Sequence, residues 1–92
     1  MQLESQIQSK IIKYLESKNY YVLKIIKCNK NGTADLIAFR KSEFPIFIEV
    51  KTEKGKQSEL QKFRQKEVEQ LGYKYYLIRS LEEFKIFIDT DC

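Results

Sequence analysis

Three charged side chains interrupt two otherwise apolar stretches near the middle of this chain. Asp35 begins the first stretch, and Glu49 and Lys51 fall within the second. Charges are rare inside β-strands, because burying one is costly unless it is paired or bound to a metal ion. Two carboxylates and a lysine that meet at one end of a β-hairpin are the minimal set of groups for metal-assisted phosphodiester hydrolysis. These residues therefore predict a hydrolytic metal site.

The pairing of the two strands decides whether these side chains meet. Glu49 and Lys51 are two residues apart, so on a strand they share one face. A hairpin with its turn centred near Glu43 would place Asp35 opposite Lys51 and diagonal to Glu49, about 7–8 Å away at Cα. A register shifted by one residue would turn Asp35 to the other face, so the chemistry also predicts the register.

Each residue of the set has an expected role in phosphodiester cleavage. Asp35 and Glu49 would supply carboxylate oxygens to a metal ion, and the backbone carbonyl of Val50 could supply a third ligand. The ion would polarise the phosphorus and lower the pKa of a bound water. Lys51 would orient or deprotonate the attacking water and offset the charge that builds on the phosphate.

The chain contains no histidine, which narrows the possible chemistry. Histidine-based catalysis and His-ligated zinc are excluded, and the distant Cys28 and Cys92 make a thiolate zinc site unexpected. A metal ion must then be held by oxygen ligands, which favours Mg²⁺ or Mn²⁺.

One Cys28–Cys92 bridge is possible, but a disulfide framework is not. With no apolar run long enough for a membrane and no signal-like amino terminus, we expect an intracellular, cytoplasmic protein.

Composition and charge indicate one domain with a basic surface. The 92 residues suffice for one compact core, so we expect a single domain over residues 1–92. The net charge is +4, and six basic residues fall within residues 51–66. This stretch predicts a nucleic-acid-binding surface, although its interleaved glutamates also fit a solvated helix face. Tyr75 and Tyr76 are expected to pack in the sheet rather than stack on bases. The residues expected to contact nucleic acid are Lys54, Lys56, Lys62 and Lys66.

Periodicity and turn signals predict the elements that position these residues. Ser58 with Gln61, and Ser80 with Glu83, have the spacing of capping boxes, and Gly72 is placed for a left-handed helix cap. The order αβββαβα predicts an α/β fold in which helices flank a central mixed four-stranded sheet. The expected helices span residues 3–18, 59–71 and, after Ser80, up to about 88, and the expected strands residues 20–27, 35–40, 46–51 and 73–79.

A resemblance to a known family rests on three segments of the chain. They are Thr33-Ala34-Asp35, then Ile48-Glu49-Val50-Lys51, and then Gly55 through Ser58 to Gln61. Together they resemble the PD-(D/E)xK nuclease superfamily, and more narrowly the small VRR-NUC domains found in phages and in DNA-repair nucleases. The resemblance covers nearly the whole chain and implies a restriction-endonuclease-like fold.

The resemblance also implies further site residues and a function. In the family an amino-terminal helix carries a glutamate and the helix after the hairpin begins with a glutamine, which Glu4 and Gln61 match. The family's proline before the aspartate is Ala34 here, but a proline is not a ligand. The resemblance implies a Mg²⁺- or Mn²⁺-dependent DNA endonuclease, selective for DNA structure in replication, recombination or repair, and is compatible with a phage gene in a bacterial host. Since one such site cuts one strand, we expect a symmetric homodimer.

Other interpretations stay open at this point. The chain also resembles archaeal Holliday-junction resolvases in size and motif, and a catalytically silent DNA-binding module could retain the same fold. Glu4 could only stabilise the positive end of its helix, and Gln61 could be only a capping residue. Asp35 could form an Asx turn. Glu49 and Lys51 could be an ion pair on an exposed edge strand.

Overall fold

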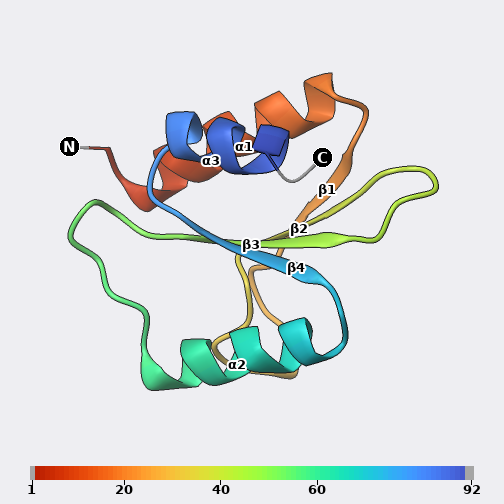
Figure 1. The fold of residues 1–92 in the computed structure, drawn as a ribbon. Coiled ribbons are helices and arrows are strands. Elements are labelled where there is room, and N and C mark those ends of the chain that lie inside the picture. Colours follow the sequence, from red (N-terminus) through yellow and green to blue (C-terminus); the bar gives the residue numbers. More distant parts are fainter. Residues whose placement is uncertain (1, 91–92) are drawn as a thin grey trace.

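The fold has three layers, with a mixed four-stranded sheet in the middle. The computed structural model describes residues 2–90. Strands β1, β2 and β3 pair antiparallel in that order, and β4 pairs parallel to β3. Helices α1 and α3 cover one face of the sheet and α2 covers the other (Figure 1). The expected αβββαβα order and central mixed sheet are confirmed. The elements are α1 (Glu4–Ser17), β1 (Tyr21–Lys24), β2 (Leu36–Phe39), β3 (Ile46–Val50), α2 (Glu59–Gln70), β4 (Lys74–Ile78) and α3 (Leu81–Thr90).

The main core lies between the sheet and the α1/α3 layer. Alternate residues of β2 and β3, such as Leu36 and Ile48, are fully buried there, as the period-two alternation of strand side chains requires. Helix α1 contributes residues at helical spacing, and α3 contributes Phe84. Leu3, expected on the apolar face of the first helix, is instead 64% exposed, because it caps α1 rather than lying inside it. The buried residues of α1 that pack in this core are Ile7, Ile11 and Leu15.

The strands are shorter than expected, most clearly β1. This strand ends at Lys24, whereas the sequence predicted that it would continue to residue 27. The chain beyond it leaves the sheet and runs toward α2 (Figure 1). There Gly32 has a φ of 78° and lies so close to α2 that a Cβ atom would be 2.8 Å from Cγ of Leu60. The segment that follows β1 therefore packs against α2 instead of continuing in the sheet.

The register of the β2–β3 hairpin differs from the expected one by two residues. Leu36 pairs with Ile48, so the next position of β2 places Asp35 beside Glu49 rather than opposite Lys51. The main-chain N–H of Asp35 donates to the carbonyl of Ile48 (3.0 Å). Because side chains alternate with period two, a shift by two residues still leaves Asp35 and Glu49 on the same face.

A tight turn at residues 40–43 explains this register. The N–H of Glu43 donates to the carbonyl of Arg40 (3.1 Å), and Ser42 takes a φ of 63°. This left-handed conformation is uncommon for a residue other than Gly, Asn or Asp. The strands consequently reverse direction about one residue earlier than a turn centred on Glu43 would allow.

The helix caps agree largely with the sequence. Ser58 and Gln61 form the expected capping box at the start of α2, and Gly72 follows that helix with a φ of 91°. At α3 the Ser80 hydroxyl accepts from the N–H of Glu83 (3.1 Å), but the Glu83 carboxylate accepts from the N–H of Arg79 (2.8 Å) rather than from Ser80. The helix then runs two residues beyond the expected end.

Two further expectations concern cysteines and membranes. Cys28 is an exposed thiol, and Cys92 lies outside the described residues, so a bridge between them stays untested. Within residues 2–90, no helix has both the length and the apolar character needed to cross a membrane.

Candidate active site

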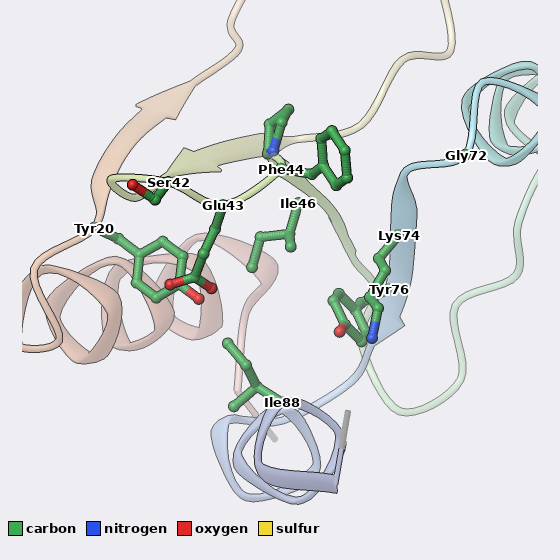
Figure 2. Close-up of a pocket in the computed structure, with 10 residues that line it drawn as sticks. Tyr20, Ser42, Glu43, Phe44, Ile46, Gly72, Lys74, Tyr76 and Ile88 are labelled. Atoms are coloured by element: carbon green, nitrogen blue, oxygen red, sulfur yellow. The ribbon is translucent and has the colours of Figure 1, made fainter. Parts of the chain in front are cut away.

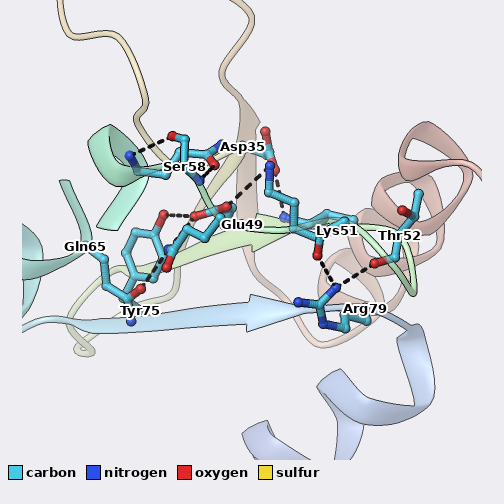
Figure 3. Close-up of polar contacts among 12 residues, drawn as sticks. Asp35, Glu49, Lys51, Thr52, Ser58, Gln65, Tyr75 and Arg79 are labelled. Carbon is cyan, nitrogen blue, oxygen red and sulfur yellow. Dashed lines mark hydrogen bonds and ion pairs between the residues drawn. The ribbon is translucent and has the colours of Figure 1, made fainter. Parts of the chain in front are cut away.

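The three charged residues predicted to act together meet at one end of the sheet. Glu49 belongs to β3, Lys51 directly follows this strand, and Asp35 directly precedes β2. All three lie on the side of the sheet that α2 covers (Figure 3). Strand β3 lies between β2 and β4, so the interpretation of Glu49 and Lys51 as an exposed ion pair on an edge strand is wrong.

Glu49 is fully buried, and its two carboxylate oxygens have different surroundings. Its Oε1 accepts hydrogen bonds from the Tyr75 hydroxyl (2.6 Å) and from the Gln57 side-chain amide (3.0 Å). Its Oε2 is buried without a hydrogen-bond donor among the described residues. The nearest positive group is Nζ of Lys51, at 3.8 Å. A buried carboxylate oxygen without a donor is unfavourable, and a cation would satisfy it.

Asp35 is half-buried and is anchored to β3 rather than to its own loop. Its Oδ2 accepts from the main-chain N–H of Val50 (2.7 Å), a bond across the hairpin instead of the local bond of an Asx turn. Burial raises the pKa of Asp35 above its ordinary value, against the effect of the Val50 hydrogen bond. The negative charges of Glu49 and Glu4 raise this pKa further, and Lys51 lowers it. The site therefore concentrates negative charge that its lysine offsets only in part.

These properties fit a divalent, oxygen-preferring cation. Asp35 and Glu49 each retain carboxylate oxygen capacity that their hydrogen bonds do not use. Within the part of the chain that the structure describes, no three His, Cys, Asp or Glu side chains form a metal-binding cluster. Further ligands would be a main-chain carbonyl, such as the expected one of Val50, and water. Mg²⁺ favours coordination by one or two protein carboxylates together with several waters.

The two residues assigned from the family resemblance lie at the edge of this site. Glu4 is the first residue of α1, and its charge acts on the pKa of Asp35. Gln61 lines a hollow of about 290 Å³ together with Asp35. The side-chain oxygen of Gln61 accepts from the N–H of Ser58 (2.8 Å), so this residue caps α2 as well as facing the hollow.

A polar network behind Glu49 was not expected from the sequence. The Gln57 amide also donates to the Gln65 side chain (2.8 Å), whose own amide donates to Glu69 (3.2 Å). Tyr75 is buried in the sheet, as expected, but its hydroxyl also belongs to this network. Tyr75 shares a sheet face with Glu49 only through the register of the parallel β3–β4 pair, which no local pattern encodes.

The loop between β3 and α2 is fixed by Arg79. Its guanidinium Nη1 donates to the carbonyls of Thr52 (2.7 Å) and Gly55 (2.6 Å) (Figure 3). Two of the four lysines expected to contact nucleic acid, Lys54 and Lys56, lie on this loop and are exposed. The other two, Lys62 and Lys66, are exposed on α2, where Lys62 pairs with Glu59 (3.2 Å).

A second hollow lies away from these residues. It has a volume of about 410 Å³ and lies where β3 and β4 begin, near the turn after β2 (Figure 2). The site residues lie where β3 ends, so this hollow contains none of them. Its charged lining residues are Glu43 and Lys74, which do not form a second carboxylate pair. The candidate site is therefore at the Asp35–Glu49 end of the sheet.

Comparisons with known proteins agree with this architecture. The chain matches no protein-family model and no curated protein. It is similar to a solved structure described as a "VRR_NUC domain", with a TM-score of 0.84 over 94% of each chain and 21% sequence identity. At this identity the likeness shows the fold, so the expected restriction-endonuclease-like α/β fold is confirmed.

Proposed function

We propose that this chain is a Mg²⁺- or Mn²⁺-dependent nuclease that hydrolyses phosphodiester bonds in DNA. The observation that carries this proposal is the buried Glu49 carboxylate beside Asp35, with one oxygen lacking a donor and Lys51 3.8 Å from it. The likeness of the fold to a VRR_NUC domain supports the same reaction class. A purely structural ion pair would not need a second carboxylate, Asp35, whose pKa is raised first by burial and then by the charges of Glu49 and Glu4.

The chain's own groups divide the work of hydrolysis. Asp35, Glu49 and the Val50 carbonyl would hold the divalent cation. When bound, such an ion polarises a phosphodiester and makes water a better nucleophile at neutral pH. Lys51 would orient the attacking water or take its proton, and would offset negative charge as the new P–O bond forms and the P–O ester bond breaks. Glu4 and Gln61 border this reaction centre.

The hydrogen bonds from Tyr75 and Gln57 give Glu49 a fixed orientation. Both donors bind Oε1, which leaves Oε2 directed toward Lys51 and available to a cation. Groups that orient a metal ligand typically change metal affinity or activity by about 10–100-fold when they are removed. Tyr75 and Gln57 are therefore positioning residues for the site.

The basic surface would bind the DNA substrate. The expected setting is intracellular, in replication, recombination or repair. The lysines of the β3–α2 loop and of α2 are exposed, and Lys62 and Lys66 line a hollow together with Gln57, the hydrogen-bond partner of Glu49. Cationic side chains of this kind bind phosphates whatever the base sequence. Two copies of the chain would supply two sites for the two strands of a duplex. Light scattering tests this homodimer. Two chains per complex are expected when DNA is present. One chain per particle, both alone and with DNA, would contradict the homodimer.

Cleavage of defined DNA structures tests the proposed function. The purified chain is incubated with linear, nicked, flapped and four-way DNA, with Mg²⁺ or with excess EDTA, beside a Glu49→Gln control. Mg²⁺-dependent cleavage that the control lacks is the expected result. Cleavage confined to four-way DNA would identify a Holliday-junction resolvase. Binding without cleavage by either protein would identify a silent DNA-binding module and refute the proposal.

A further inference from the structure

The hollow beside Asp35 is formed mainly by the segment that connects β1 to β2. This hollow has a volume of about 290 Å³. Its lining comes from residues 25–33 of this segment, which include the apolar Ile25 and Ile26 besides polar and basic residues, and from Gln61 of α2. Besides Asp35, none of its lining residues is acidic. The polar and basic lining residues of the connecting segment are Lys27, Lys30, Asn31 and Thr33.

The lysines of this segment are available for an anionic ligand. Lys27 and Lys30 are both exposed. Within residues 2–90, neither has a carboxylate within ion-pair distance. The sequence from residue 20 to residue 34 contains no aspartate or glutamate. In the predicted basic stretch, Lys62 is already paired with Glu59, whereas Lys54, Lys56 and Lys66 have no carboxylate within ion-pair distance in residues 2–90.

The segment is fixed against α2 rather than extended into solvent. Arg64 of α2 donates through Nε to the carbonyl of Asn31 (2.9 Å). Gly32 packs against Leu60 at a distance that leaves no room for a Cβ atom. At the base of the segment, the N–H of Ile25 donates to the carbonyl of Asp35 (2.8 Å). A binding wall that is already ordered loses little conformational entropy when a ligand binds.

The sheet places this segment on the other side of Asp35 and Glu49 from the Lys54–Lys56 loop. Where β1 ends, β2 begins and β3 ends, and the paired residues there are Lys24, Leu36 and Ile48. The β1–β2 segment and the β3–α2 loop therefore leave the sheet at the same end. The first leaves beside β2 and the second beside β4, where Arg79 holds it. The two carboxylates lie between two basic walls.

We propose that Lys27 and Lys30 bind a backbone phosphate of the DNA strand, next to the phosphodiester that is cleaved. This inference rests on the proposed nuclease function and assigns the β1–β2 segment as a second phosphate-binding wall of the substrate channel. The amide and hydroxyl groups of Asn31, Thr33 and Gln61 supply uncharged hydrogen-bonding partners in the same hollow. The strand would then pass from this wall, across Asp35, to the β3–α2 loop.

The salt dependence of DNA binding tests this assignment. The double variant Lys27→Gln/Lys30→Gln is compared with Lys10→Gln/Lys13→Gln, a matched control in which two exposed lysines of α1 with the same spacing are replaced. DNA affinity is measured by fluorescence anisotropy at several salt concentrations, with EDTA present to prevent cleavage. The slope of log K against log [salt] should decrease by roughly 0.7–0.9 for each phosphate that is no longer neutralised. The control should keep the slope of the unsubstituted chain.

Protection of Cys28 from alkylation gives a second, independent readout. Cys28 lies between the two lysines, is exposed, and donates through its thiol to the carbonyl of Lys30 (3.2 Å). In a Cys92→Ser chain, Cys28 is the only remaining thiol. Saturating DNA should slow its reaction with a maleimide several-fold, and this protection should disappear when Lys27 and Lys30 are replaced.

The two readouts separate the failure of this inference from the failure of the proposed function. Normal Mg²⁺-dependent cleavage with an unchanged salt slope and no protection of Cys28 would overturn the inference and leave the nuclease intact. Protection of Cys28 and a reduced slope without any cleavage would support the phosphate wall and refute the nuclease. A chain that binds no DNA would overturn both.

Discussion

Tyr75→Phe removes one hydroxyl group from the site and leaves the aromatic ring in the sheet. This hydroxyl donates to the buried Oε1 of Glu49 at 2.6 Å. Burial, and then the hydrogen bond and charge of Glu49, raise the pKa of Tyr75, so the hydroxyl remains a donor throughout the accessible pH range. After the substitution, Gln57 is the one remaining hydrogen-bond donor to Glu49 among the described residues.

The expected effect follows from the type of hydrogen bond. A bond to a charged group contributes about 1.5–3 kcal/mol to stability, and complete burial of Glu49 favours the upper part of this range. For a domain of this size, removing this bond would lower Tm by roughly 10 °C or more. In the presence of Mg²⁺, the Glu49 carboxylate would be oriented by Gln57 without Tyr75, which should also reduce cleavage or metal affinity by about 10–100-fold.

Urea denaturation in EDTA and a cleavage assay with Mg²⁺ measure the two effects. Tyr73→Phe is the matched control, because Tyr73 stacks on Phe47 and its hydroxyl has no hydrogen bond within residues 2–90. The control should change stability by less than about 0.5 kcal/mol. Equal stability and activity of the two variants would refute the argument that Tyr75 positions Glu49.

Three further predictions concern the metal site and the segment beside it. Lys51→Ala should abolish cleavage but retain Mn²⁺ binding in isothermal titration, whereas Glu49→Gln should lose both; a Lys51→Ala chain that cleaves normally would refute the assigned mechanism. Asp35→Asn should raise the stability of the metal-free chain at neutral pH, because a raised pKa makes the ionised form costly in the folded state. This cost appears as pH rises above about 4, the pKa of an aspartate in the unfolded chain. Thermal unfolding in EDTA should therefore show equal stability of variant and parent below that pH. A variant less stable than the parent at pH 7 would contradict this prediction. Gly32→Ala should destabilise the fold by about 1–3 kcal/mol in urea, from its φ of 78° and its contact with α2; Gly72→Ala, which has a φ of 91° but open space around it, should cost less, and an equal cost would contradict the close approach.

Local patterns in the sequence were sufficient to predict the order of the helices and strands. The helical spacing of Ile7, Ile11 and Leu15 identified the buried face of α1, and the Ser58 cap identified the start of α2. The charges of Asp35 and Glu49 in apolar surroundings indicated which end of the sheet carries the site. These signals are local in sequence, because each depends on side-chain periodicity or on a single turn of backbone.

Features that depend on distant segments could not be predicted in this way. The hairpin register was wrong by two residues, because it is set by the left-handed conformation of Ser42, a residue that seldom adopts it. The contacts of Tyr75 and Gln57 with Glu49 require a parallel strand pair and a loop held by Arg79. Such contacts join residues far apart in the chain and leave no periodic signal.

Nicking of supercoiled plasmid DNA by the purified chain tests the central claim most directly. The chain is first treated with EDTA and then assayed with and without added Mg²⁺, beside Glu49→Gln prepared in the same way. We predict no nicking in EDTA, nicking when Mg²⁺ is restored, and none by Glu49→Gln under either condition. Robust nicking in excess EDTA, or equal nicking by Glu49→Gln, would contradict a metal-dependent nuclease centred on Asp35 and Glu49.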